Sequence, residues 1–195
     1  MDRLHALIII TALCGAACNG EPPKPPPSAT RVEAVTAKGP DDNAVAGFCD
    51  IHAKPGAGEA FALPPVSAPP KEKSGGAQWV NVWATWCKPC VEELPMMQAW
   101  GPRLSGDGAP TAMHYVNVDA EASSVEQFRA DHPGTPESLR IASPEALAPW
   151  MEGLGLDPGA GLPIHAFVGK DGRTRCVRSG AVTEDHYALV KTLLR

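Results

Sequence analysis

The clearest hydrophobic pattern in the chain is the run from Trp79 to Trp83, where apolar, aromatic and β-branched residues dominate. A short continuous run of this composition predicts a buried strand. The alternation of apolar and polar residues from Ala112 to Val118 predicts a second central strand. Between the two strands, a helix is expected to start at the cysteine turn and to continue over residues 91–104, with a kink at Pro95.

The remaining predicted elements depend on capping and turn signals. Ser143 has the chemistry of an N-cap before a helix, and Thr183 has it before the last helix. Asp171-Gly172 lies between two strand-like runs, which is a strong hairpin signal. These signals predict helices over 143–154 and 183–194, strands over 139–141, 164–169 and 174–179, a helix over 124–132, and an edge strand broken by prolines over 61–66.

The N-terminal residues have the pattern of a targeting segment. The apolar or small run from Ala6 to Ala17 is too short to span a bilayer comfortably and suits a signal peptide. Small residues precede Cys18, as in the lipobox of bacterial lipoproteins, although Gly15 stands where that motif has leucine. We therefore expect a signal peptide over 1–17 and lipidation of Cys18. An ordinary secretory signal or a short anchor is the alternative.

The composition supports one folded domain after a linker. The 195 residues include 21 prolines, and five of these lie between positions 22 and 27. Such a cluster forms a stiff spacer. We expect a linker over 18–46 and the folded domain over 47–195. A net charge of −5 without a basic run argues against nucleic acid as a partner.

Cys87 and Cys90 lie where the predicted strand becomes a helix, and Pro89 between them suits a first helical turn. The N-terminus of a helix presents unpaired N–H groups and a partial positive charge, which stabilise a thiolate. Such a position can lower the pKa of a cysteine from ~8.5 to roughly 3.5–7.5. We therefore expect Cys87 to be an exposed nucleophile and Cys90, one turn further in, to resolve the mixed disulfide.

The sequence from Trp83 to Cys90, followed by Glu93 and Pro95, resembles the TlpA/ResA-like thiol–disulfide oxidoreductases of the thioredoxin superfamily. The strands and helices also follow the thioredoxin order. The resemblance covers roughly residues 61–195. It implies an α/β thioredoxin-like fold, with a central mixed sheet flanked by helices and an N-terminal extension.

The resemblance also implies roles for residues around the cysteine pair. Glu93 would lie near the active site and exchange a proton with Cys90; a solvated acid in the first helical turn is the alternative. Pro163 would be cis and would present the backbone of Leu162 to a substrate; a trans proline opening a strand is the alternative. We expect the substrate-binding surface to consist of Leu162 and Pro163 together with Trp86, Lys88 and Pro89.

Asn81 and two additional cysteines depart from the family pattern. Asn81 occupies the position where thioredoxins have a buried aspartate, and asparagine cannot titrate. Cys49 and Cys176 lie outside the shared motif; an even remainder in an oxidising compartment predicts a structural disulfide, and two buried free thiols are the alternative. His165 could lie near the site, but a lone histidine that begins a strand is more often a packing residue.

Together these patterns predict an enzyme of the bacterial periplasm, anchored to the membrane as a lipoprotein or secreted across the inner membrane. The resemblance implies reduction of protein disulfides as the activity, a role in cytochrome c maturation, and a membrane electron donor as partner. No cofactor is expected, and no metal, because no further ligands stand at metal spacing beside the cysteine pair. The alternatives are a disulfide-introducing oxidase and a copper-binding or interaction module of the same fold.

Overall fold

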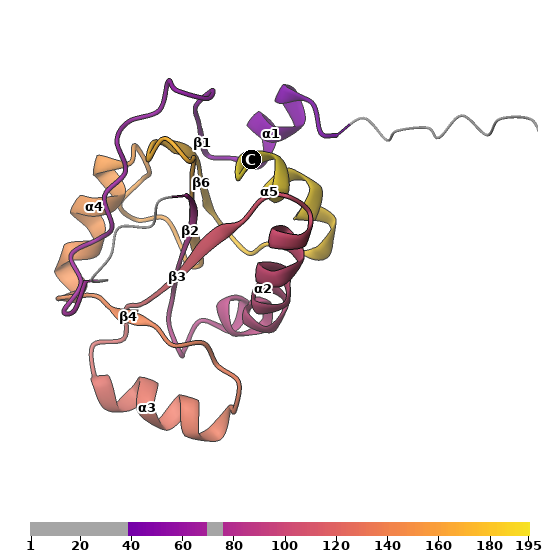
Figure 1. Cartoon of the computed structure of the whole chain (residues 1–195). Coiled ribbons are helices and arrows are strands. Elements are labelled where there is room, and N and C mark those ends of the chain that lie inside the picture. The colour runs from indigo at the N-terminus through magenta and orange to yellow at the C-terminus, as the bar shows by residue number, and fades with distance from the viewer. Residues whose placement is uncertain (1–38, 70–75) are drawn as a thin grey trace, which may run out of the picture. The chain divides into compact units, whose positions relative to one another are not determined.

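The structure is a computed structural model that describes residues 39–69 and 76–195. Its centre is a six-stranded mixed sheet with the order β1-β6-β5-β2-β3-β4 (Figure 1). The elements are α1 (Asp42–Phe48), β1 (Ile51–His52), β2 (Ala77–Trp83), α2 (Lys88–Gly106), β3 (Thr111–Asn117), α3 (Ala122–Asp131), β4 (Leu139–Arg140), the 3₁₀ helix η1 (Pro144–Ala146), α4 (Leu147–Gly153), β5 (Ile164–Val168), β6 (Thr174–Ser179), the 3₁₀ helix η2 (Glu184–His186) and α5 (Tyr187–Leu193). This is the predicted thioredoxin-like α/β fold.

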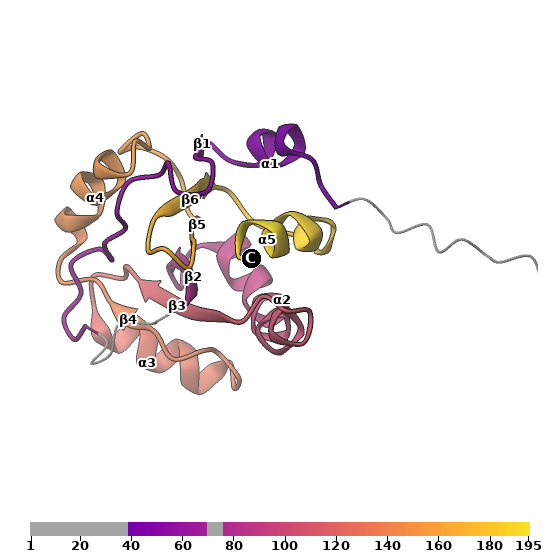
Figure 2. The same ribbon diagram turned by 45° about the horizontal axis from the view of Figure 1, so that its top comes forward.

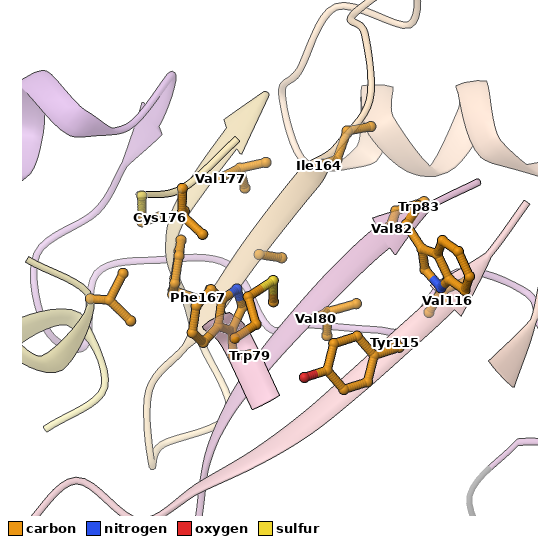
Figure 3. Close-up of a cluster of buried hydrophobic side chains, with 14 of the residues drawn as sticks. Trp79, Val80, Val82, Trp83, Tyr115, Val116, Ile164, Phe167, Cys176 and Val177 are labelled. Carbon is orange, nitrogen blue, oxygen red and sulfur yellow. The ribbon is translucent and has the colours of Figure 1, made fainter. Parts of the chain in front are cut away.

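Strand β2 is the central element of the core. It pairs in parallel with β3 and antiparallel with β5, so that both of its edges are occupied. Six of its seven residues are buried, as the continuous apolar run predicts for a strand covered on both faces. Figure 3 shows the side chains of Trp79 and Phe167 beside each other in this core, with ring centroids 5.1 Å apart.

Helices α2 and α5 lie side by side on one side of the sheet, and α4 lies on the other (Figures 1 and 2). Trp100 of α2 contacts Tyr187 of α5 edge-on, with centroids 5.0 Å apart. The buried positions of α2 recur at helical spacing and face the sheet; they are Cys90, Glu93, Leu94, Met97, Trp100 and Leu104. Helix α2, which begins at the cysteine pair, is therefore packed against the sheet from Cys90 to Leu104.

The predicted edge strand over 61–66 is wrong. The segment forms only isolated bridges at its two ends, Ala60 with Arg173 and Val66 with Ile141. The physical reason is that Pro64 and its neighbour Pro65 have no N–H to donate to a ladder. The sheet edge is formed instead by β1, which pairs with β6 and which the sequence did not predict.

The N-terminal part of the folded unit begins with α1. Asp41 caps this helix by accepting a hydrogen bond from Ala44 N–H at 2.8 Å. Phe48 at its end is 5% exposed and packs against Phe167, with centroids 5.9 Å apart. The expected signal peptide, the lipidation site Cys18 and most of the expected linker lie outside the described residues.

Candidate active site

The cysteine pair closes a disulfide across the first turn of α2. Cys87 is the N-cap, and Pro89 lies in the first turn, where no backbone N–H is needed. Cys87 Sγ is bonded to Cys90 Sγ and accepts a hydrogen bond from Cys90 N–H at 3.3 Å. The oxidised pair is thus placed at the positive end of the helix dipole.

The expected exposure of Cys87 is wrong for this oxidised state. Cys87 is 5% exposed and Cys90 is fully buried. Both the bond to Cys90 and the contact with the helix N–H turn the Cys87 sulfur inward. Its chain neighbour Trp86 is 71% exposed, so the indole and not the sulfur dominates the surface here.

The two glutamates of the helix lie in different environments. Glu92 is exposed and pairs with the equally exposed Lys88 at 3.7 Å, a surface contact that contributes little to stability. Glu93 is 4% exposed, on the same face of α2 as Cys90. The structure therefore places Glu93, and not Glu92, in the interior behind the cysteine pair.

Glu93 is held by N–H donors from two other segments. Asn81 Nδ2 donates to Oε1 at 2.9 Å, and the backbone N–H of Val182 donates to Oε2 at 2.8 Å. The Nε2 atom of His165 lies 3.3 Å from Oε1, off the line of a well-aligned hydrogen bond. The neutral Asn81 is thus a direct partner of the buried acid, in the position where thioredoxins have an aspartate.

His165 belongs to the site, although the sequence analysis favoured a packing role for it. It is fully buried on β5, opposite Asn81 of β2. Its Nδ1 atom accepts a hydrogen bond from Trp79 Nε1–H at 3.2 Å, and Asn81 Nδ2 lies 3.5 Å from the same atom. One sequence signal could have indicated the position of His165. It and Asn81 are polar residues within two otherwise apolar runs that were both predicted to be strands.

Tyr115 of β3 adjoins this buried group. Burial raises the pKa of its hydroxyl to about 12, and the charge of Glu93 contributes to the same shift. A tyrosine with this pKa stays protonated and neutral throughout the physiological range. Tyr115 therefore adds no negative charge beside Glu93.

The Leu162–Pro163 peptide bond is cis. Leu162 lies at the rim of a groove of about 430 Å³, which is also lined by Trp86, Val118, Met151 and Ala160. Among the residues that the structure describes, no charged side chain lines this groove. Trp86 and Leu162, two of the expected substrate-binding residues, thus share one apolar surface, whereas Lys88 points to solvent.

A second disulfide joins Cys49 and Cys176, which are 127 residues apart in sequence. It links the C-terminal end of α1 to the strand β6. Cys176 is fully buried among core residues and faces Phe167 across the sheet. This pair is separate from the Cys87–Cys90 disulfide and fastens the N-terminal segment to the sheet.

Metal-ligand clusters and membrane-spanning helices are two further features to consider in the described part of the chain. Within residues 39–69 and 76–195, no three or more histidine, cysteine, aspartate or glutamate side chains gather as a metal site would require. In the same ranges no helix is both long and apolar enough to cross a membrane.

The chain is similar in sequence to known thiol–disulfide oxidoreductases. ResA thiol–disulfide oxidoreductase of Geobacillus thermodenitrificans is 28% identical over 111 residues, which cover 57% of this chain and 59% of that protein. ResA of Bacillus cereus is 26% identical over 105 residues, 53% of this chain and 54% of the relative. The chain thus spans less than two thirds of the length of these relatives. It matches no family model.

Among solved structures, a thioredoxin-family thiol:disulfide interchange protein of Chlorobium tepidum is 25% identical, with a TM-score of 0.50. The alignment covers 62% of this chain and 81% of that one. The chain is thus similar to the ResA thiol–disulfide oxidoreductases, and its fold is thioredoxin-like. In this chain the buried Glu93 and His165 lie behind the Cys87–Cys90 disulfide, and the relatives that it resembles are named thiol–disulfide oxidoreductases.

Proposed function

We propose that this protein is a thiol–disulfide oxidoreductase that reduces disulfides in other proteins. The observation that carries the proposal is the Cys87–Cys90 disulfide across the start of α2, with the buried carboxyl of Glu93 one turn behind Cys90. Once a reductant has opened this disulfide, the helix N-terminus stabilises the thiolate of Cys87, and the adjacent buried acid can exchange a proton with the thiol of Cys90.

The reaction begins with the reduced pair. The Cys87 thiolate attacks one sulfur of a substrate disulfide, which forms a mixed disulfide and releases the other substrate sulfur as a thiolate that takes a proton from solvent. Cys90 then transfers its proton to Glu93, and the Cys90 thiolate attacks Cys87 Sγ. The bond between Cys87 and the substrate breaks, and the substrate leaves as a dithiol. The enzyme pair has lost two electrons and the substrate has gained them.

Substrate binding is assigned to the surface beside the pair. Trp86 and Leu162 border the apolar groove, which suits an uncharged or apolar stretch around the substrate cysteine. Among the described residues, the backbone N–H and C=O of Leu162 have no hydrogen-bond partner. Both groups are free to pair with an extended peptide as a short added strand, and Pro163 and Pro89 complete this surface.

The cellular setting follows from the same proposal. In an oxidising compartment such as the periplasm the pair stays reduced only if a membrane electron donor reduces it again after each cycle. The stable Cys49–Cys176 disulfide suits such a compartment. A signal peptide over 1–17, lipidation at Cys18 and a linker to the folded domain would hold the enzyme at the membrane, and apocytochrome c awaiting haem is the proposed substrate.

The test is catalysed reduction of insulin disulfides, followed by measurement of the reduction potential against glutathione. We expect turnover by the wild type, loss of turnover in Cys87→Ser, and a potential more negative than that of the glutathione couple. Absence of turnover by the wild type would refute the activity. A potential well above that of glutathione would replace the reductase with an oxidase, since about 30 mV corresponds to ~1.4 kcal/mol for this couple. Tight binding of Cu(I) by a protein without turnover would favour the copper-binding alternative.

A further inference from the structure

The buried group behind Cys90 contains two polar side chains from strands that are otherwise apolar, Asn81 and His165. Both are fully buried, so each polar atom needs a partner within the protein. His165 has two ring nitrogens, and their protonation can be assigned from the atoms that face them.

Trp79 determines which nitrogen of His165 carries the proton. The indole Nε1 is always a donor, and it lies 3.2 Å from His165 Nδ1. A proton on Nδ1 would therefore face another proton. His165 must accept at Nδ1 and carry its hydrogen on Nε2, which is the atom that faces Glu93 at 3.3 Å. An imidazolium would lose the bond from Trp79, so the contact is that of a neutral N–H with a carboxyl and not an ion pair.

The surroundings of Glu93 match its ionised form. Oε1 faces Asn81 Nδ2–H and His165 Nε2–H, and Oε2 accepts from the N–H of Val182. All three contacts in the described part of the chain are donors, and a protonated carboxyl would have to set its hydrogen against one of them. Two neutral N–H donors, from Asn81 and Val182, thus hydrogen-bond the buried carboxylate. The Nε2–H dipole of His165 lies 3.3 Å from Oε1 and adds a favourable electrostatic contact without a cation.

We propose that Trp79 and His165 are positioning residues for Glu93: Trp79 keeps His165 as the neutral Nε2–H tautomer, and that N–H keeps the carboxylate ready to take the proton of Cys90. This inference rests on the proposed function. It adds two residues that the cysteine motif does not contain. It also implies that the hydrogen on His165 Nε2 stays in place during the reaction. The proton of Cys90 is therefore taken by Glu93 and not by His165.

The consequence appears in the second half of the reaction. Cys90–SH gives its proton to the Glu93 carboxylate, the sulfur attacks the mixed disulfide, and Glu93 returns the proton to solvent after the substrate has left. A histidine that gained a second proton in the acid range would compete with Cys90 as the proton partner of Glu93. The bond from Trp79 removes this competition.

Other titratable or charged groups that face Glu93 and His165 must be considered in any pH experiment. They are Cys90 on α2, Tyr115 on β3, Arg178 on β6 and His186 on η2. Tyr115 keeps its proton between pH 5 and 9, because burial raises its pKa to about 12. Among these four groups of the described chain, His186 is the one besides the thiol that can change charge in this interval, and burial together with Arg178 lowers its pKa. His186→Gln therefore serves as the background for the pH measurements.

The direct test is ¹⁵N NMR of the histidine rings in the full chain, oxidised and reduced, between pH 5 and 9. We expect His165 to keep the shifts of a neutral ring with hydrogen on Nε2 throughout. A ring that becomes doubly protonated near pH 6.5, or one with its hydrogen on Nδ1, would overturn the inference. This readout needs no substrate, so it stands even if the proposed activity fails.

The kinetic test compares three variants in the release of a thiol from a preformed mixed disulfide with Cys87. His165→Gln keeps an N–H near the position of Nε2, and His165→Leu removes it; Phe167→Leu alters packing beside the ring without a polar change. We expect about tenfold slower release with His165→Leu, because the carboxylate loses the N–H dipole that lies beside Oε1, and near wild-type rates with the other two.

The kinetic outcomes separate the two proposals. Equal slowing of His165→Leu and His165→Gln, or of His165→Leu and Phe167→Leu, would reduce His165 to a packing residue and overturn the inference. Failure of the wild type itself to release the thiol would refute the proposed function, whereas the NMR result would still decide the tautomer.

Discussion

Asp119 holds Thr85 at two points. Its Oδ2 accepts a hydrogen bond from the backbone N–H of Thr85 at 3.0 Å, and its Oδ1 accepts one from the Thr85 hydroxyl at 2.8 Å. The carboxylate is 4% exposed and accepts a further bond from Asn117 Nδ2. Because Thr85 lies two residues before Cys87, this contact fixes the turn through which β2 leads into the active-site helix.

Replacement of Asp119 should therefore loosen the active-site turn. In Asp119→Ala the N–H of Thr85 loses its acceptor, and we expect the free energy of unfolding to fall by about 2–3 kcal/mol. Asp119→Asn keeps one acceptor oxygen and should lose less. Urea unfolding of the oxidised proteins measures the difference. Wild-type stability of Asp119→Ala would contradict a structural role for this contact.

Of the two disulfides, Cys49–Cys176 should contribute more to the free energy of unfolding. It closes a loop of 127 residues, for which the chain-entropy relation gives about 5 kcal/mol, against about 2 kcal/mol for the short Cys87–Cys90 ring. Double replacement by serine at each pair, followed by chemical unfolding, tests the ranking. We expect the larger loss for the Cys49/Cys176 variant, and a larger loss for the Cys87/Cys90 variant would show the assignment to be reversed.

Two glycines should respond in opposite ways to an added methyl group. A Cβ on Gly58 would lie 1.8 Å from the carbonyl oxygen of Thr174, a backbone atom of β6. We expect Gly58→Ala to destabilise the protein by about 2 kcal/mol or more. Gly101 is inside α2 with nothing within 4 Å of its Cβ position, so that Gly101→Ala should stabilise by up to ~1 kcal/mol. Thermal unfolding of both variants measures the signs, and equal shifts would contradict the packing of Gly58 against β6.

Asp107 should make stability depend on pH in the acid range. It accepts hydrogen bonds from Lys191 Nζ and Tyr187 Oη, each at 3.0 Å, and the bond from Lys191 is the main cause that lowers the pKa of its carboxyl below 3.8. A lowered pKa in the folded state stabilises at pH values above the ordinary value, and the contribution is lost as pH falls through the folded value.

The matching experiment compares the wild type with Asp107→Asn. The wild type should be the more stable protein at pH 7, and the difference should shrink toward zero near pH 3. Urea unfolding at the two pH values gives both differences. A gap that persists undiminished at pH 3 would assign the effect to packing and not to the charge of Asp107.

The sequence predicted those parts of the fold that depend on local patterns. The strand around Trp79–Trp83 and the turn at Asp171-Gly172 carry strong periodic or turn signals, and the structure has β2 and the β5–β6 hairpin there. Strand β1 has only two residues and forms because β6 offers an edge, so no local pattern marks it. Over 61–66 the composition resembled a strand, but the missing N–H groups of the prolines prevented pairing.

The candidate site could be predicted only in part, for a similar reason. Cys87 and Cys90 are adjacent in sequence and stand at a recognisable strand–helix boundary. The partners of Glu93 come from residues 81, 165 and 182, which the sheet brings together across more than a hundred positions. Neither His165 nor Asp119 has a sequence neighbour that reveals its contact, because both act through pairings between separate segments.

The measurement that tests the central claim most directly is the trapping of a mixed disulfide. The reduced Cys90→Ser variant is mixed with oxidised insulin, and the adduct is located by peptide mapping under non-reducing conditions. The account predicts a covalent adduct through Cys87, and no comparable adduct through Cys90 in the Cys87→Ser variant. Absence of an adduct in Cys90→Ser, or equal trapping through Cys90, would contradict the assignment of Cys87 as the nucleophile.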